Sequence, residues 1–447
     1  MRKKIAILLG RLANFASKCT GKNGSVIGGY WALKVDKNLL DKITYPKTII
    51  GVTGSTGKSS TTELIAHILT KSGKTVAYNK DGSNAVNGIT SLVLENCDLN
   101  GKINKDVLLM ELDEKFAKYI IKKIKPTHFV ITNITRDQPS RNAHPEAIYN
   151  EIKEIIPKST TLILNADDPY VVRFGLEHKK KSYYYGLDKT KYSFKKPYLN
   201  NLDAAYCPIC NNKLKYNFYH YSHIGSYECS KCSFKRPNLN YEAHNIDLNK
   251  QKIFIGTDQI NIPSDFLYSV YFTLAAYAVC NVIGISKSKI KNIVNENSLK
   301  TKRYTVYNFN NRKLQFLLSK NETNVSYEQS INYVINKKGY KNVVMGFDNV
   351  SRRYKENDIS WLYDINFEKL NNESINKIII FGRFRYDFLL RLEYAGIDKN
   401  KIILLENRED VLNTLKEKTT GDIYMIVYFD IIEYFTKILN EGVENEN

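Results

Sequence analysis

The sequence lacks the long apolar segments that membrane insertion and secretion require. No stretch is a convincing match to the roughly 20 apolar residues of a membrane-spanning helix. The apolar run near the N-terminus stops at Arg11, too soon for the core of a signal peptide, and Lys18 before Cys19 makes a poor cleavage site. We therefore expect a cytosolic protein.

Acidic residues are scarce relative to basic ones. The chain has 46 Asp and Glu against 66 Lys and Arg, which gives a formal net charge of +20. Such an excess is compatible with a nucleic acid, an anionic membrane surface or an acidic substrate as partner. The lysines are scattered and Asn, Ile, Lys and Tyr are all abundant, which favours neutral drift in an AT-rich genome. A basic protein is still attracted to anionic lipid headgroups.

Cysteine is also scarce, and four of the seven cysteines are clustered, as Cys207, Cys210, Cys229 and Cys232. In a reducing cytosol this indicates a metal site before a disulfide framework. Each C-x2-C pair places two thiolates on one side of a tight turn, and two pairs complete a closed tetrahedral shell for structural Zn²⁺. A closed shell has no position for substrate, so it stabilises an insert, at residues 203–237. A zinc ribbon that binds nucleic acid is the alternative.

The run Thr48–Thr62 lacks the full G-x-x-x-x-G-K-[ST] pattern of a phosphate-binding loop, but it has G-x-x-G-K-S between an apolar β-branched run and an amphipathic helix. Gly54 and Gly57 allow a tight turn whose N–H groups face an anion at the helix N-terminus. Lys58 can neutralise phosphate charge, and Ser59 can ligate Mg²⁺. The sequence therefore predicts a site for a nucleoside triphosphate.

From residue 48 onwards, short apolar strands alternate with helices, which predicts a mostly parallel α/β sheet covered by helices. The expected strands of this part span residues 48–53, 75–78, 107–112, 128–133 and 161–165. Glu111, Asn133 and Asn165 then stand at or near carboxyl ends of strands, where parallel sheets bind ligands. For any one of them, a structural cap at the strand end is the alternative.

The 447 residues are enough for two or three domains. We expect a helical lead-in at residues 1–46 with a turn at Gly28–Gly29, a central ATP-binding domain at 47–299, and a smaller α/β domain without a phosphate loop at 300–447. The apolar segment Phe266–Ile285 predicts a buried helix rather than a membrane span, because turn signals flank it and Ser and Thr dilute it. The last domain should contain strands at 313–318, 342–347, 377–381, 402–405 and 423–429, and helices at 327–337 and 385–394.

Several motifs together resemble the Mur ligase family, ATP-dependent enzymes that form amide bonds in peptidoglycan precursors. The general family motifs are matched by Thr53–Thr61, Asn133–Gln138 and Leu164–Pro169. More narrowly, the chain resembles the ligase subunits of lipid II isoglutaminyl synthases. That branch is indicated by the four-cysteine insert and by Asn79–Gly88, Glu111–Glu114, Leu318–Asn321, Asp358–Asp364, Phe367–Glu368 and Arg391–Gly396.

The resemblance implies the ligase half of a heterodimeric glutamine amidotransferase. A separate glutaminase subunit, GatD in this family, releases ammonia. The ligase subunit uses ATP to phosphorylate the α-carboxyl of D-glutamate in lipid II, at the inner face of the cytoplasmic membrane, and ammonia displaces the phosphate to give D-isoglutamine. No nucleic acid is expected as a partner.

The resemblance also implies roles for particular residues. Ser59 and Glu111 would hold Mg²⁺, and Lys58 and Glu111 would take part in phosphoryl transfer. Asp358 would reach the glutaminase and complete its Cys-His-Asp triad, with a helix N-cap as the alternative role. The residues that would bind ATP are Thr53, Gly54, Ser55, Thr56, Gly57, Lys58, Ser59, Ser60 and Asn133.

The chain departs from the family pattern at some positions. Ser269 and Phe272 replace an Asn-x-x-Asn pair near the adenine site, and Lys355–Asn357 replace an Asp-Gly-Arg segment. Two other functions stay open: a Mur-type ligase that adds an amino acid instead of ammonia, and a basic zinc-ribbon protein that binds ATP and nucleic acid without catalysis.

Overall fold

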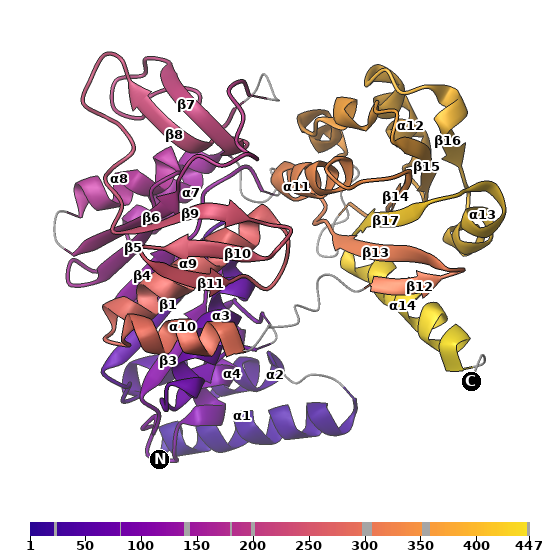
Figure 1. Cartoon of the computed structure of the whole chain (residues 1–447). Helices are drawn as coiled ribbons and strands as arrows, with labels where there is room; N and C mark the ends of the chain where they lie inside the picture. Colours follow the sequence, from indigo (N-terminus) through magenta and orange to yellow (C-terminus); the bar gives the residue numbers. More distant parts are fainter. Residues whose placement is uncertain are drawn as a thin grey trace. The chain divides into compact units, whose positions relative to one another are not determined.

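The computed structural model describes residues 1–21, 25–80, 82–137, 144–178, 181–197, 202–296, 306–350 and 358–444. The chain forms two compact units, which Figure 1 shows with their helices and strands labelled. The first consists of Met1–Thr135, His144–Lys195 and Ala204–Lys300. The second consists of Arg136–Ala143, Lys196–Asp203 and Thr301–Asn447.

The first unit is built on a nine-stranded sheet with the order β11-β10-β9-β6-β5-β4-β1-β3-β2. Its strands from β2 to β9 pair in parallel, and β9, β10 and β11 form an antiparallel edge. The strands are β1 (Thr48–Thr53), β2 (Val76–Tyr78), β3 (Val107–Glu111), β4 (His128–Ile131), β5 (Thr161–Asn165), β6 (Ser182–Leu187), β9 (Tyr241–Asp247), β10 (Lys252–Ile255) and β11 (Asp258–Asn261). The central strands are buried on both faces, as expected for parallel strands between two layers of helices.

Two rows of helices cover this sheet. Helices α3 (Lys58–Lys71), α9 (Leu267–Val282) and α10 (Lys287–Glu296) pack against one another in one row. The other row contains α4 (Val86–Asn96), α5 (Glu114–Ile121), α7 (Pro145–Lys153) and α8 (Pro169–Glu177). Helix α9 is buried along most of its length, as predicted for residues 266–285. Within the described residues, no helix is both long and apolar enough to cross a membrane.

The N-terminal residues form the helix pair α1 (Arg2–Cys19) and α2 (Ile27–Val35), followed by the short helix η1 (Leu39–Lys42). The predicted turn at Gly28–Gly29 is wrong, because both glycines lie inside α2. A Cβ on Gly28 would stand 2.3 Å from Asn14 Oδ1, and one on Gly29 would stand 1.9 Å from the Asn87 carbonyl oxygen. Glycine is present here for close helix packing rather than for a turn.

A separate antiparallel hairpin, β7 (Leu214–Tyr221) and β8 (Ile224–Cys229), carries part of the cysteine cluster. An isolated bridge pairs Tyr206 with Lys213 and another pairs Glu228 with Lys235. The predicted zinc-ribbon insert at residues 203–237 therefore has the strand pairing of a ribbon.

The second unit has a six-stranded sheet with the order β12-β13-β17-β14-β15-β16, parallel except for the edge pair β12 and β13. Its strands are β12 (Val306–Phe309), β13 (Arg312–Leu318), β14 (Lys341–Gly346), β15 (Ile375–Phe381), β16 (Ile402–Leu404) and β17 (Asp422–Val427). Its helices are α11 (Asn324–Ile335), η2 (Ser360–Asp364), η3 (Phe367–Leu370), α12 (Arg385–Tyr394), η4 (Lys399–Lys401), η5 (Arg408–Asp410), α13 (Val411–Lys418) and α14 (Phe429–Glu444).

Most expected elements are confirmed to within a few residues, including β1, β5 and α12 at both ends. Strand β4 ends at Ile131, two residues before the expected end, because Thr132 and Asn133 bond to the loop after β1. The proposed domain boundary near residue 300, Gln138 and the segment Lys355–Asn357 lie outside the described residues. Two short segments, Arg136–Ala143 and Lys196–Asp203, belong to the second unit although they were predicted to be part of the central domain.

Candidate functional site

The loop between β1 and α3 has the backbone of an anion-binding turn. Gly54 has a φ of +130°, and Gly57, the N-cap of α3, has a φ of +82°. Both values belong to the region that favours glycine. A Cβ on Gly54 would lie 2.2 Å from Thr132 Oγ1, whereas one on Gly57 would meet no atom within 4 Å. Glycine is therefore required at position 54 because the residues after β4 pack closely against it, and at position 57 because of the backbone conformation that leads into the helix.

The segment after β4 holds this loop in place. Asn133 Oδ1 accepts a hydrogen bond from the Thr56 backbone N–H at 3.0 Å, and Asn133 Nδ2 donates to the Thr56 carbonyl at 3.1 Å. The Ser55 backbone N–H donates to the Asn133 carbonyl, and Ser55 Oγ donates to the Thr135 carbonyl. The side chain of Asn133, which was predicted to contact ATP, is therefore hydrogen-bonded to the backbone of the predicted phosphate loop.

Lys58 begins α3 and points to a neighbouring acid. Its Nζ lies 2.6 Å from Oε1 of Glu114, the first residue of α5, and both side chains are largely buried. The same Nζ donates to the Gly54 carbonyl. No role for Glu114 was predicted from the sequence. The signal was its position three residues after the end of β3, which brings the side chain to the carboxyl edge of the sheet.

Glu111 ends β3 and is buried beside two asparagines. Its Oε1 accepts a hydrogen bond from Asn84 Nδ2 at 3.2 Å. Its backbone N–H donates to Asn79 Oδ1 at 2.8 Å, and Asn79 Nδ2 donates back to its carbonyl at 3.0 Å. The segment that contains Asn79 and Asn84 therefore fixes the position of Glu111.

The remaining loop residues differ in how accessible they are. Thr53 is buried, with its hydroxyl bonded to the Leu112 carbonyl, and Ser60 is also buried. Ser59, the second residue of α3, is half-buried. Asn165 is fully buried, with its amide donating to the Thr132 carbonyl, so its role is the strand-end cap that we considered as the alternative.

The two acids that follow Asn165 connect the sheet to the cysteine hairpin. Asp167 accepts hydrogen bonds from Arg236 Nε at 2.6 Å and from the Tyr271 hydroxyl at 2.7 Å. Asp168 caps α8 and accepts from the Ile134 backbone N–H at 2.7 Å. Both acids therefore have structural roles. Asp168 is the N-cap of α8 before Pro169, and Asp167 accepts hydrogen bonds within a buried network.

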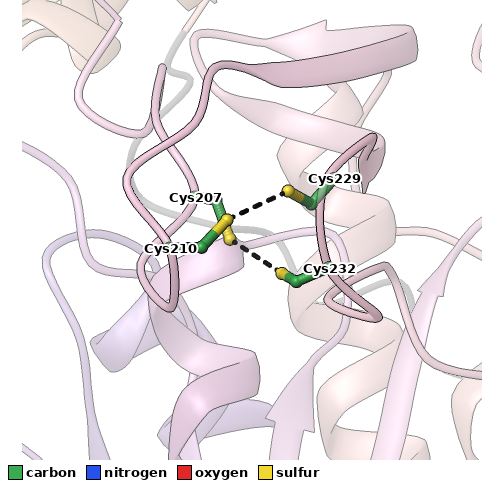
Figure 2. A group of neighbouring side chains, drawn as sticks. All are labelled: Cys207, Cys210, Cys229 and Cys232. Carbon is green, nitrogen blue, oxygen red and sulfur yellow. Dashed lines mark hydrogen bonds between the residues drawn. The ribbon is translucent and has the colours of Figure 1, made fainter.

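The four cysteines converge as predicted (Figure 2). Their sulfur atoms all lie within 4.8 Å of one another, with Cys207 and Cys232 Sγ 3.6 Å apart and Cys210 and Cys229 Sγ 3.4 Å apart. These distances are too long for disulfides. They are close to the separation of about 3.8 Å that a tetrahedral zinc site with Zn–S bonds of about 2.3 Å requires. The donor set therefore fits structural Zn²⁺, without an open coordination position.

The two ends of this hairpin make different contacts. One end carries the cysteines, and the other packs on the sheet, where the Gly225 N–H donates to the Asp167 carbonyl and Tyr227 donates to the Ala166 carbonyl. His220 is buried near Asp167, with ring nitrogens close to Ser193 Oγ and the Leu187 carbonyl. Burial lowers the pKa of His220, so the ring is neutral at pH 7.

The two positions that depart from the adenine-site pattern lie at the start of α9. Ser269 is fully buried, and its hydroxyl donates to the carbonyls of Ser264 and Phe266, both at 2.7 Å. Phe272 is also buried, and its ring packs near Tyr268. Neither residue supplies a side-chain amide at this position.

The second unit brings together motifs that are far apart in the sequence. Asp137 accepts hydrogen bonds from Lys320 Nζ, at 2.9 Å to Oδ2, and from the Thr323 hydroxyl. Arg136 Nη1 lies 2.9 Å from Oδ2 of Asp364, and Arg136 Nε lies 3.3 Å from Asp203. Arg136, Lys320 and Asp364 belong to separate motifs in the sequence, and only the structure shows that the adjacent residues Arg136 and Asp137 pair with the other two.

Asp358 is exposed, just before η2. Its Oδ1 accepts a hydrogen bond from the Ser360 backbone N–H at 2.9 Å, in the turn that precedes η2. The N-cap of η2 is Ile359, so the helix N-cap considered for Asp358 is wrong by one residue. The hydrogen bonds from Ser360 lower the pKa of the Asp358 carboxyl, so the group is ionised at pH 7. An exposed carboxylate held in this way can contact another protein.

Comparisons with known proteins agree with these features. The Mur ligase middle domain matches residues 52–263, and the MurT ligase C-terminal domain matches residues 318–430. A lipid II isoglutaminyl synthase (glutamine-hydrolyzing) subunit MurT from Staphylococcus aureus (strain COL) is 32% identical over 403 residues, covering 89% of each chain. The corresponding subunit from Streptococcus pneumoniae is 28% identical and covers 98% of this chain and 97% of its own.

A solved structure shows the same fold. A pseudomurein peptide ligase type C from Methanothermus fervidus aligns with a TM-score of 0.68 and 22% identity, covering 91% of this chain and 81% of the ligase. The expected α/β architecture, a Mur-type central domain followed by a smaller C-terminal α/β domain, is confirmed. Taken together with the phosphate loop and the cysteine hairpin, these matches place the chain in the Mur ligase family, among the MurT subunits of lipid II isoglutaminyl synthase.

Proposed function

We propose that this chain is the ATP-dependent ligase subunit of a lipid II isoglutaminyl synthase. It converts the α-carboxyl of D-glutamate in lipid II to the amide of D-isoglutamine, using ammonia from a GatD-like glutaminase partner. The observation that carries the proposal is the phosphate loop, with its two glycines in left-handed conformations and Lys58 at the start of α3, in a chain of the MurT family.

In the proposed reaction, a carboxylate oxygen of the substrate attacks the γ-phosphorus of ATP and ADP leaves, which gives an acyl phosphate. Ammonia then attacks the acyl carbon and phosphate leaves, so that a C–N bond forms and a proton is released. Because the substrate carboxylate is the nucleophile, the protein needs no nucleophilic side chain. Its task is to position the phosphates and to stabilise their charge.

Individual residues have defined parts in this reaction. The N–H groups between Gly54 and Ser60 face the phosphates at the positive end of α3. Lys58 leaves Glu114 to contact the transferred phosphoryl group. Ser59 and Glu111 supply the oxygen ligands that Mg²⁺ prefers, and the ion would neutralise phosphate charge. Asp358 orients the catalytic histidine of the glutaminase.

The test is co-expression with a GatD-like glutaminase, followed by mass spectrometry of muropeptides. We expect the mass change of a carboxyl-to-amide conversion with the wild-type chain, and none with Lys58→Ala. Lys71→Ala, at the other end of the same helix and exposed, is the matched control and should behave as wild type. Identical muropeptides from wild type and Lys58→Ala would refute the proposal. A mass increase by one amino acid residue would show the other type of ligase.

The role of Asp358 is tested by two substitutions and an external ammonia source. Asp358→Asn keeps a side-chain oxygen that can accept from the Ser360 N–H, and Asp358→Ala removes it. If Asp358 serves the glutaminase, both variants lose glutamine-dependent amidation and regain it with ammonium chloride. If Asp358 only holds the turn before η2, Asn supports normal glutamine-dependent activity.

A further inference from the structure

Helix α1 is apolar on two opposite faces. Its inner face buries Ala6, Ile7, Gly10 and Asn14 against the rest of the first unit. Its outer face exposes Ile5, Leu8, Leu9, Leu12 and Phe15, whose spacing of three and four residues places them in one stripe. A surface helix normally presents charged or polar residues to water on this side. The outer face of α1 is therefore suited to contact another apolar phase.

Helix α2, which packs beside α1, also exposes large apolar side chains. The Arg2 side chain bonds to the Val35 carbonyl and Asn14 bonds to the Gly28 N–H, so α1 and α2 run antiparallel, side by side, at the lower edge of the first unit in Figure 1. Helix α2 exposes Tyr30 and Trp31, whose rings make an edge-to-face contact with centroids 5.6 Å apart. Of the 22 large apolar side chains that are exposed in the described residues, ten lie within residues 1–31. A smaller group in the second unit consists of Tyr363, Tyr386, Leu390 and Tyr394.

The charged side chains of the helix pair itself are of one sign. Residues 1–35 contain seven Lys and Arg and no Asp or Glu. Helical spacing places Arg2 on one border of the apolar stripe of α1, and Lys4 and Lys18 on the other. Lys18 Nζ also lies 2.9 Å from Oε1 of Glu95 on α4, the acid that borders this surface. Lys34 Nζ lies 5.5 Å from the centre of the Tyr30 ring. Tyr and Trp beside Lys and Arg, around an apolar stripe, are the composition of helices that lie in the headgroup region of a membrane.

We propose that the outer face of α1, together with Tyr30 and Trp31 of α2, binds the surface of an anionic phospholipid bilayer, with α1 parallel to the membrane. The charge distribution favours this occupant over a second copy of the chain. A symmetric dimer through this face would bring two predominantly basic surfaces together, whereas anionic headgroups attract them. The reason for such binding rests on the proposed function, because the substrate is carried on a lipid.

Membrane binding of this kind changes the search for substrate without changing the chemistry. A bound enzyme meets a lipid-linked substrate by diffusion in the plane of the bilayer. Rates with vesicle-embedded lipid II should therefore depend on the outer face of α1. Rates with a soluble analogue that carries a short prenyl chain should not.

Trp31 provides a direct probe of binding. It is 50% exposed, whereas Trp361, the second tryptophan, is 4% exposed. Vesicles that contain phosphatidylglycerol should shift the emission of the wild-type protein to shorter wavelength. The Trp31→Phe variant should show no shift, because Trp361 stays buried in both conditions. Vesicles of phosphatidylcholine alone, or high salt, should weaken the effect.

Flotation with the same vesicles tests the apolar face. The double variant Leu12→Gln/Phe15→Gln changes only exposed side chains, so the fold should be kept. We expect its partition coefficient to fall at least about tenfold. Leu176→Gln is the control, because Leu176 is an exposed leucine, 47% accessible, on α8 and outside the helix pair, and this variant should bind as wild type.

Three results would overturn the inference. One is wild-type protein that binds no vesicles. Another is equal binding by the double variant and the wild type. The third is a wild-type dimer in sedimentation velocity that the double variant converts to monomer, which would show that a second copy covers the face. Measuring amidation of the soluble analogue separates this inference from the proposed function. If the wild-type protein binds vesicles but does not amidate the soluble analogue, only the proposed function is contradicted.

Discussion

The ion pair between Lys58 and Glu114 can be tested by a double-mutant cycle that separates stability from catalysis. The variants are Lys58→Met, Glu114→Gln and the double variant. In the folded protein, Lys58 Nζ lies 2.6 Å from Glu114 Oε1, and the side chains are 11% and 4% exposed. Each single variant removes one charge of this pair and leaves the other in place.

The expected magnitude follows from this geometry. At 2.6 Å and an effective dielectric constant of about 20, two unit charges attract by about 6 kcal/mol before desolvation is counted. Desolvation offsets much of this attraction. Removing one partner of such a pair should lower the free energy of unfolding by about 3 kcal/mol. The double variant removes both charges, so we expect it to be less destabilised than the sum of the single variants, with a coupling of about 2 kcal/mol.

Hydrogen exchange of the backbone amides of β1 is the suitable assay, because it reports the opening of the first unit without requiring two-state unfolding of the whole chain. Muropeptide analysis of the same variants gives the activity. We expect Lys58→Met and the double variant to be inactive although their stabilities differ. A coupling below about 0.5 kcal/mol would refute the argument that this buried pair stabilises the loop.

Three further predictions follow from the structure. Removing zinc with a chelator, or Cys207→Ser, should speed the exchange of the Gly225 N–H, which bonds to the sheet at the far end of the hairpin, more than tenfold; an unchanged rate would mean that the hairpin docks without metal. Burial lowers the pKa of His220 from its usual 6.5, so the unfolded chain binds more protons than the folded protein and the free energy of unfolding falls as the pH drops below that value. His220→Gln should reduce this slope, measured by urea unfolding at several pH values, by up to about 1.4 kcal/mol per pH unit, and an unchanged slope would contradict the assignment. Gly54→Ala should abolish ATP binding, because a Cβ at 2.2 Å from the end of β4 displaces the loop, whereas Gly57→Ala should weaken it less, because that Cβ meets no neighbour; calorimetric titration with ATP distinguishes the two, and equal losses would contradict the steric argument.

Sequence alone determined the features that depend on local patterns. The apolar β-branched run of β1, the glycine turn and the start of the following helix are all encoded within residues 48–62, so this strand, turn and helix were predicted correctly. The spacing of the four cysteines predicted their convergence, because each C-x2-C pair forms a local turn. The helix predicted at residues 385–394 matches α12 at both ends.

Only the tertiary structure decided the partners of polar side chains. A motif shows that Asn133, Lys58 and Asp137 occur, but not that Asn133 bonds to the loop backbone, that Lys58 pairs with Glu114, or that Asp137 joins Lys320. The glycines of α2 also show that local sequence does not identify long-range contacts. Glycine in a local sequence suggests a turn, but at Gly28 and Gly29 it is needed because other segments pack where a Cβ would stand. Local sequence sets backbone preference and periodicity, whereas the choice of a long-range partner depends on which segments the assembled sheet brings together.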